Sequence, residues 1–301
     1  MIRKWVSGHW VIMMRGNDSQ AAMEKALVRD TSGTLLTRVI VKRYSWRSLE
    51  PTKNNYVLSE IYSDLKFAAS KGARLCVMWE DKTFKDERVA PDYLSEYEVQ
   101  INTPRTPIGY SMIRWHPYVL ERLKALVMAL GVFDTHLSFV GIATEETALG
   151  ISSDVLTAKG YTPELYASYY KDFFDYCSWA LPTSRVMWHM NFMPGDLENK
   201  WIDNVIQSLP ALDNVVYGGP DCLPEEEALV NRTYWLYEKH RYLKSFIQMS
   251  PACYKQDKTF WELFRFGREN LYAKIVMWTN INTDKWKWQD AVEVIKANPG
   301  F

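Results

Sequence analysis

The stretch FVGIATEETALG, from Phe139 to Gly150, contains the pattern on which the predicted fold depends. It begins with a short apolar run, residues 139–143, whose length and β-branched content are typical of a buried strand. Two adjacent carboxylates, Glu145 and Glu146, follow at the point where that strand would emerge. Ionisable side chains at the end of a buried strand indicate a place where chemistry can occur.

Similar apolar runs recur along the chain, with amphipathic helical segments between them. We predict strands at residues 10–14, 37–44, 74–79, 139–143, 185–190, 214–217, 243–249 and 273–279. We predict helices at residues 19–29, 58–71, 116–130, 163–180, 199–209, 225–237 and 259–269. Alternation of this kind predicts a parallel sheet, and eight strands of it predict an α/β fold, the closed (β/α)₈ TIM barrel. A doubly wound sheet is the alternative, but no GxGxxG motif follows the first strand.

The domain organisation follows from the absence of any linker. The 301 residues contain no Ser/Gly-rich segment and no shift in composition, so we expect a single barrel domain over residues 1–301. Residues 82–114 differ from the rest because they are polar, contain prolines and show no clear periodicity. Long connections are uncommon unless they have a function. We therefore expect residues 82–114 to be a loop insertion after strand three, lying over the C-terminal face.

Charge and composition argue against several classes of partner and cofactor. The 36 Lys and Arg balance the 36 Asp and Glu without a block of one sign, so neither nucleic acid nor an anionic membrane is predicted as a partner. The N-terminal residues are a poor signal peptide and no apolar run is long enough to span a membrane, so we expect a soluble chain. Four dispersed cysteines and five scattered histidines predict no disulfide framework, no metal site and no cofactor.

Carboxylates and tryptophans collect at the predicted strand ends, which form the active face of such barrels. The residues pooled there are Arg15, Trp46, Glu50, Trp79, Glu80, Asp81, Glu145, Glu146, Trp188, His189, Asn191, Asp221, Gln248, Ser250, Trp278 and Asn280. This combination fits carbohydrate chemistry, in which one carboxylic acid protonates the glycosidic oxygen and a second carboxylate supports the positive carbon. Indole rings provide flat apolar faces for sugars, and the chain has 13 Trp. We expect two or more of the pooled tryptophans to line the cleft.

The two adjacent carboxylates are not equivalent. If the strand persists, neighbouring residues face opposite ways, so at most one of Glu145 and Glu146 points into the barrel mouth. If both point inward, their repulsion raises one pKa, which suits a general acid. The alternatives stay open for Asp221, which contacts ligand or caps a turn, and for His189, which serves the site or the core.

The strings YSWRSLEP, WEDKTF, ATEETALG, NFMPG, GGPD and VMWTN resemble bacterial and phage proteins described as glycoside-hydrolase-like. The barrel with a carboxylate after strand four also resembles the clan A glycoside hydrolases, including the family 5 cellulase-like enzymes. This resemblance implies that Glu146 is the general acid/base and that Glu145 stands where the clan has an Asn. It further implies a nucleophilic Glu at the end of strand seven, where this chain has Gln248, which cannot form the glycosyl ester.

Three explanations for the missing strand-seven carboxylate remain. Asp221, Glu80 or Asp81 replaces it, an N-acetyl group of the substrate acts instead, or the barrel binds sugar without cleaving it. The leading prediction is a hydrolase of glycosidic bonds in a poly- or oligosaccharide, with Glu146 and either Asp221 or Glu80 as catalytic carboxylates. The predicted substrate contacts are Glu145, Trp46, Trp79, Trp188, His189, Asn191, Gln248 and Trp278. The alternative is a noncatalytic carbohydrate-binding barrel, for example in a phage particle or a surface assembly. For either function, the expected location is cytoplasmic or phage-encoded.

Overall fold

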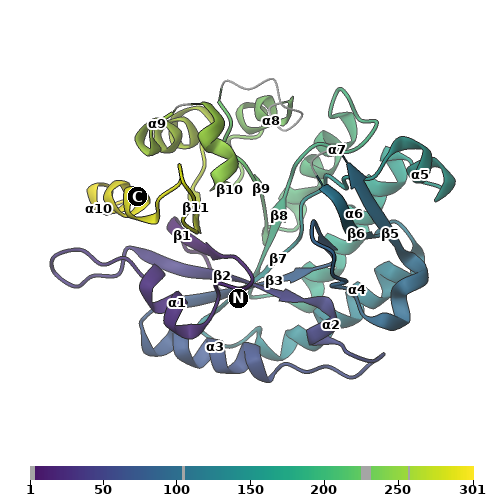
Figure 1. Cartoon of the computed structure of the whole chain (residues 1–301), viewed down its shortest axis with the longest axis horizontal. Helices are drawn as coiled ribbons and strands as arrows, with labels where there is room; N and C mark the ends of the chain where they lie inside the picture. The colour runs from purple at the N-terminus through teal and green to yellow at the C-terminus, as the bar shows by residue number, and fades with distance from the viewer. Residues whose placement is uncertain (1–3, 104–105, 225–231, 257) are drawn as a thin grey trace.

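The computed structural model describes residues 4–103, 106–224, 232–256 and 258–301. Within these ranges, eight parallel strands form a closed barrel in the order β1-β11-β10-β9-β8-β7-β3-β2 (Figure 1). They are β1 (Gly8–Met13), β2 (Thr37–Ser45), β3 (Arg74–Glu80), β7 (Phe139–Ala143), β8 (Arg185–His189), β9 (Val215–Gly219), β10 (Ser245–Met249) and β11 (Ile275–Asn280). Each overlaps one of the eight predicted strands, so the predicted (β/α)₈ TIM barrel is confirmed.

Helices surround the barrel, as Figure 1 shows. They are α1 (Gln20–Ala26), α2 (Trp46–Leu49), α3 (Ser59–Ser70), α4 (Pro117–Leu130), α5 (Ser153–Ala158), α6 (Pro163–Ala180), α7 (Lys200–Ser208), α8 (Tyr234–Lys239), α9 (Phe260–Arg265) and α10 (Trp288–Ala297). The predicted cap of α6 is present, because the Thr162 side chain accepts a hydrogen bond from the Leu165 amide at 3.0 Å. The predicted helix at 225–237 falls largely on residues 225–231, which lie outside the described ranges.

Strand alternation divides the core into two layers. The side chains that fill the barrel include Trp10, Ile12, Val39, Val41, Cys76, Met78, Val140, Ala143, Met187, Val216, Phe246, Ile275 and Met277. The intervening strand residues point outward and pack under the helices in a larger cluster. Whether a residue at a strand end reaches the barrel mouth therefore depends on which of the two layers it continues.

One glycine permits the close packing of β7 against β8. Gly141 has a φ of +150°, and a Cβ placed there would lie 1.9 Å from the Arg185 carbonyl oxygen. The pairing of β3 with β7 also shifts register near this glycine, between Leu75 and Cys76. A side chain at position 141 would push β7 away from its neighbour. Gly141 therefore sets the path of the strand that leads to Glu145.

The expected loop at residues 82–114 contains regular structure. Three antiparallel strands, β4 (Lys82–Thr83), β5 (Glu98–Thr103) and β6 (Thr106–Met112), form a separate sheet in the order β4-β6-β5. A 3₁₀-helix, Asp92–Tyr97, precedes β5. Val99 and Ile101 are buried while Gln100 between them is polar and exposed, which is the alternation expected of a half-exposed strand. We call residues 82–114 the insertion.

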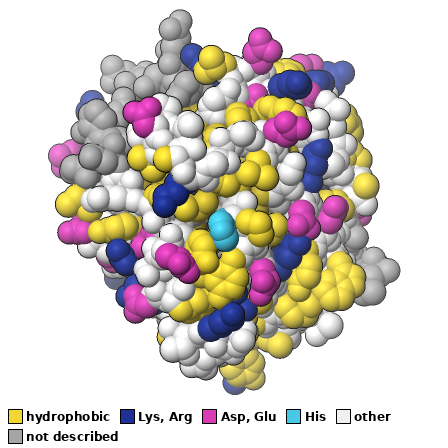
Figure 2. Space-filling view, turned by 90° about the vertical axis from the view of Figure 1, so that its right-hand side faces the viewer, with side chains coloured by type: hydrophobic (Ala, Val, Ile, Leu, Met, Phe, Trp, Pro, Cys, Tyr) yellow, Lys and Arg dark blue, Asp and Glu magenta, His cyan; other side chains and the backbone are white. Residues whose placement is uncertain are grey.

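Other features of the chain concern its surface and its thiols. On the face shown in Figure 2, acidic and basic side chains are interspersed. No helix within the described residues is long and apolar enough to cross a membrane. The four cysteines are buried and free. In the described part of the chain, no group of three or more Asp, Glu, His or Cys side chains is placed to hold a metal ion.

Candidate active site

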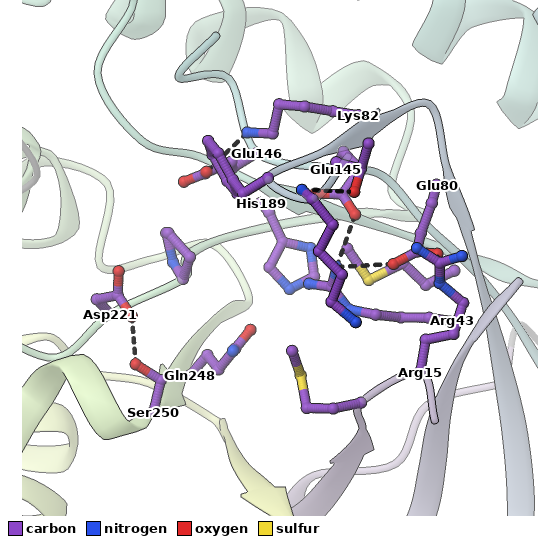
Figure 3. A pocket seen from close by; sticks show the side chains of 16 residues that line it. Arg15, Arg43, Glu80, Lys82, Glu145, Glu146, His189, Asp221, Gln248 and Ser250 are labelled. Atoms are coloured by element: carbon purple, nitrogen blue, oxygen red, sulfur yellow. Dashed lines mark hydrogen bonds and ion pairs between the residues drawn. The ribbon is translucent and has the colours of Figure 1, made fainter. Parts of the chain in front are cut away.

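A cavity of about 320 Å³ lies at the C-terminal mouth of the barrel (Figure 3). This volume is at the lower end of the roughly 300–1,000 Å³ typical of ligand pockets. Among the described residues, its wall contains the carboxylates Glu80, Glu145, Glu146 and Asp221 and the cations Arg15, Arg43, Lys82 and Lys85. The insertion contributes residues 82–85 to this wall. The cavity therefore brings together all three predicted catalytic carboxylates.

Both Glu145 and Glu146 line the cavity. The expectation that at most one of them points inward depended on the strand continuing through them. β7 ends at Ala143, so alternation does not apply to the two glutamates. The two carboxylates nevertheless have different partners, and these partners separate their protonation behaviour.

Glu145 shares an arginine with Glu80. Arg43 Nη1 lies 2.8 Å from Glu145 Oε1 and 3.4 Å from Glu80 Oε1, as the dashed lines in Figure 3 show. Arg15 Nε lies 2.8 Å from the other oxygen of Glu80. Burial raises the pKa of Glu145, and Arg43 only partly opposes this effect. Glu145 therefore holds a proton to higher pH than an ordinary glutamate.

Glu146 is held by partners at both of its oxygens. Lys82 Nζ donates to Oε1 at 2.7 Å, and Asn191 Nδ2 donates to Oε2 at 2.7 Å. The Arg114 guanidinium also donates to the backbone oxygen of Glu146 at 2.7 Å. Burial disfavours the charge of Glu146, but Lys82 and the two hydrogen bonds outweigh it and lower the pKa of this carboxyl. Asn191, a predicted substrate contact, thus orients Glu146 and is outside the cavity wall.

His189 and Gln248, which were predicted to contact substrate, form part of the cavity wall. Thr144 O lies 2.9 Å from His189 Nδ1, which places the proton of the ring on that nitrogen. Burial lowers the pKa of His189 to about 3, so the ring is neutral over the physiological range. Gln248 Nε2 donates to Thr279 Oγ1 at 3.3 Å. Both side chains therefore present uncharged polar groups to the cavity.

Asp221 follows β9 and reaches the cavity together with Ser250. The Ser250 hydroxyl donates a hydrogen bond to Asp221 Oδ1. In Figure 3 this pair lies at the opposite side of the view from Arg15 and Arg43. Asp221 is half-buried, so its carboxylate is more accessible than that of Glu80 or Glu145.

The four tryptophans predicted to bind substrate do not line the cavity. Trp46, Trp79, Trp188 and Trp278 are each at most 2% exposed and lie in the layer between the barrel and the helices. Trp79, Trp188 and Trp278 each follow a methionine that fills the barrel, so alternation points their indoles outward. Trp46 begins α2 and donates its indole N–H to Glu50 at 3.1 Å. The prediction that two or more of them line the cleft is wrong.

Two further carboxylates predicted at the strand ends, Asp81 and Glu50, are buried and pair with arginines. Asp81 is 2% exposed and accepts hydrogen bonds from Arg114 Nε and Nη2 at 2.7 and 2.8 Å. Glu50 is fully buried and pairs with Arg122. Neither is part of the cavity wall. Asp81 is therefore not a replacement for the missing strand-seven carboxylate.

Comparisons with known proteins give a match in structure only. No protein-family profile matches the chain, and no curated protein matches its sequence. Endoglycoceramidase II from Rhodococcus sp. superposes with a TM-score of 0.58 at 12% identity, over 97% of this chain and 78% of the other. The catalytic domain of β-amylase from Paenibacillus polymyxa gives 0.60 at 9% identity, over 97% and 98%. A xylanase from Thermoanaerobacterium saccharolyticum gives 0.52 at 13%, over 93% and 89%. The barrel fold of glycoside hydrolases is thus shared, and chemistry has to be argued from the site.

Proposed function

We propose that this protein binds a carbohydrate at the barrel mouth and hydrolyses a glycosidic bond there. The observation that carries the proposal is the position of Glu145 and Glu146, which face one cavity at the C-terminal end of a barrel strand. This is the face on which (β/α)₈ enzymes have their active sites. The names of the structural neighbours, an endoglycoceramidase, a β-amylase and a xylanase, support a glycosidic substrate.

The partners of the two glutamates assign their roles. Glu145 has a raised pKa and is the proposed acid, which gives its proton to the departing glycosidic oxygen. Glu146 has a lowered pKa and is the proposed base, which takes a proton from the attacking water as the water oxygen bonds to the anomeric carbon. The two protons balance, and exchange with solvent restores both groups. This assignment gives Glu146 the base role, whereas the resemblance implied an acid/base role.

The remaining polar groups of the wall have supporting roles in this proposal. Glu80 fixes Arg43, which in turn holds Glu145. Asp221 is the accessible carboxylate across the cavity and binds sugar hydroxyls, and His189 and Gln248 do the same with uncharged groups. Because a single water attacks directly, the product has inverted anomeric configuration.

The test is release of reducing sugar from a panel of poly- and oligosaccharides. Glu145→Gln and Glu146→Gln should each lower turnover by about 10²–10⁴-fold, the usual contribution of a general acid or base. Glu238→Gln is the control, since Glu238 forms an exposed ion pair with Arg241 outside the cavity wall. Unchanged turnover in Glu146→Gln would refute its role, and a product of retained configuration would refute direct attack by water.

A noncatalytic carbohydrate-binding barrel is the second candidate. It is favoured by Gln248, which occupies the end of the seventh barrel strand where the resemblance implies a nucleophilic Glu. This candidate predicts sugar binding by calorimetry with no reducing-sugar release from any member of the panel. Under that outcome, Glu146→Gln should weaken binding and leave no activity to lose.

A further inference from the structure

Lys82, the first residue of the insertion, is buried against Glu146. Its side chain is 1% exposed, and Nζ donates to Glu146 Oε1 and to the Ala148 backbone oxygen, both at 2.7 Å. The ammonium also lies 4.8 Å from the centre of the Phe84 ring. A buried ammonium is costly unless it is paired and hydrogen-bonded, so these contacts fix the position of the side chain. Of the two hydrogen-bond acceptors, only Glu146 is a carboxylate, so Glu146 is the anionic partner of Lys82.

We propose that Lys82 is a positioning residue that holds the Glu146 carboxylate ionised and in one orientation at the cavity wall. This inference rests on the proposed function, since it supplies the ionised base of that reaction. The insertion would then contribute to the chemistry of the site and not only to the shape of the cavity.

The other groups around Glu146 cannot replace Lys82 in this role. Within the described residues, the charged and titratable groups around Glu146 include Lys82 on β4, Arg114 after β6, Arg43 on β2, the adjacent Glu145, His189 on β8 and Asp221 after β9, and the same cavity wall contains Arg15, Glu80 and Lys85. Arg114 contacts the backbone oxygen of Glu146, and Arg43 binds Glu145 and Glu80. Within the described residues, the ion pair to the Glu146 carboxylate comes from Lys82.

Asn191 contributes orientation more than charge. Its Nδ2 donates to Glu146 Oε2 at the same distance, 2.7 Å, that separates Lys82 Nζ from Oε1. Both hydrogen bonds are charge-assisted because their acceptor is a carboxylate, but Lys82 also brings a positive charge, which Asn191 lacks. A cation in direct contact lowers the pKa of a carboxyl by about 1–3 units. Removal of Lys82 should therefore raise the Glu146 pKa more than removal of Asn191.

The experiment follows the titration of Glu146 directly. Protein labelled with ¹³C at the glutamate carboxyls is titrated by NMR, and the Glu146 signal is identified as the one lost in Glu146→Gln. In the unmodified protein this signal should titrate below the ordinary glutamate range. In Lys82→Met its midpoint should rise by about 1–3 pH units. Lys82→Arg should keep it low, and Lys124→Met, which removes a lysine paired with Asp172 outside the cavity wall, should leave it unchanged.

Two results would overturn the inference. One is a Glu146 signal that titrates at or above the ordinary value in the unmodified protein, which requires no Lys82 variant to fold. The other is an unchanged midpoint in folded Lys82→Met, because a merely structural lysine would lower thermal stability without moving the Glu146 titration. If Lys82→Met does not fold, the titration of the unmodified protein decides. Asn191→Leu should then raise the Glu146 midpoint by less than the roughly 1–3 pH units expected for loss of a contacting cation.

The same variants separate this inference from the proposed function. The NMR titration needs no turnover, so it has an answer even if no saccharide is hydrolysed and the proposed function fails. If hydrolysis is observed, the acid limb of the kcat/KM profile should move to higher pH in Lys82→Met, because the base must be ionised. Hydrolysis with an unmoved acid limb would retain the proposed function and overturn the role of Lys82.

Discussion

Replacement of Arg114 by Met should strongly destabilise the protein. The Arg114 and Asp81 side chains are each 2% exposed and form a bidentate ion pair with distances of 2.7 and 2.8 Å. Arg114 Nη1 additionally donates to Glu146 O at 2.7 Å and to the Tyr166 hydroxyl at 2.9 Å. Arg114→Met removes these four hydrogen bonds and a fifth, to the Tyr170 hydroxyl at 3.3 Å, and leaves the Asp81 carboxylate buried without its cation.

The expected loss is about 3–5 kcal/mol of unfolding free energy, the usual cost of breaking a buried pair by removing one partner. The measurement is urea unfolding at neutral pH, followed by tryptophan fluorescence and by far-UV circular dichroism. Arg241→Met is the matched control, because Arg241 and Glu238 form a pair whose side chains are 64% and 58% exposed. That control should change the unfolding free energy by less than about 1 kcal/mol.

A double variant makes the same point more sharply. Arg114→Met combined with Asp81→Leu removes both charges and leaves no unpaired ion in the core, so it should cost less than the two single changes added together by about 2 kcal/mol. If the losses of unfolding free energy in the two single variants simply add in the double variant, the Arg114–Asp81 pair makes no coupled contribution to stability. A loss below about 1 kcal/mol for Arg114→Met alone would have the same meaning.

Two further predictions concern the barrel itself. Gly141→Ala should lower the unfolding free energy by several kcal/mol or prevent folding, because the new Cβ would lie 1.9 Å from Arg185 O. Gly131→Ala is the control, since its nearest contact is at 3.5 Å and its thermal midpoint should change little. Equal thermal midpoints for the two variants would contradict the packing described for β7. Burial lowers the pKa of His9 to about 4, and its neutral ring accepts from Trp278 Nε1 at 3.0 Å and donates to Asn298 O at 3.1 Å. As pH falls from about 6.5 to 4, the unfolded state takes up a proton that the folded state does not, so the unfolding free energy should fall by at most about 3 kcal/mol from this group. His9→Gln should flatten that part of the pH dependence measured by urea unfolding, and an identical slope in both proteins would contradict it.

The barrel could be predicted from the sequence because parallel strands buried on both faces are continuous apolar runs. The run 139–143 is an example, and β7 has those bounds. The sheet of the insertion was missed because its strands are partly exposed and show only short alternation. The apolar Val99 and Ile101 alternate with the polar Glu98 and Gln100, and this short alternation is the pattern that predicts a strand.

The tryptophans show what alternation could have predicted. Trp79 immediately precedes Glu80, and Trp188 immediately precedes His189. If the polar residue of each pair faces the barrel mouth, the indole beside it faces the helices. The same rule would have found Arg43, which continues the inward series of Val39 and Val41 on β2.

The partners of the carboxylates could not be predicted in this way. Lys82 and Glu146 are 64 residues apart, and Arg43 and Glu145 are 102 apart. No local pattern connects such pairs, because they meet only when the barrel closes. The sequence therefore identified the carboxylates of the cavity wall and Arg15, but not Arg43 and Lys82, the cations that contact Glu145 and Glu146.

The first and last residues of the insertion, Lys82 and Arg114, both contact Glu146. Lys82, at its start, binds the side chain of Glu146, and Arg114, at its end, binds the backbone oxygen. Replacing the insertion by a tight turn to widen the cavity would remove both contacts, the one to the Glu146 side chain and the one to its backbone oxygen, in a single step. Libraries that vary the insertion should hold these two positions constant, and grafts onto other barrels should carry residues 82, 114 and 146 as one unit.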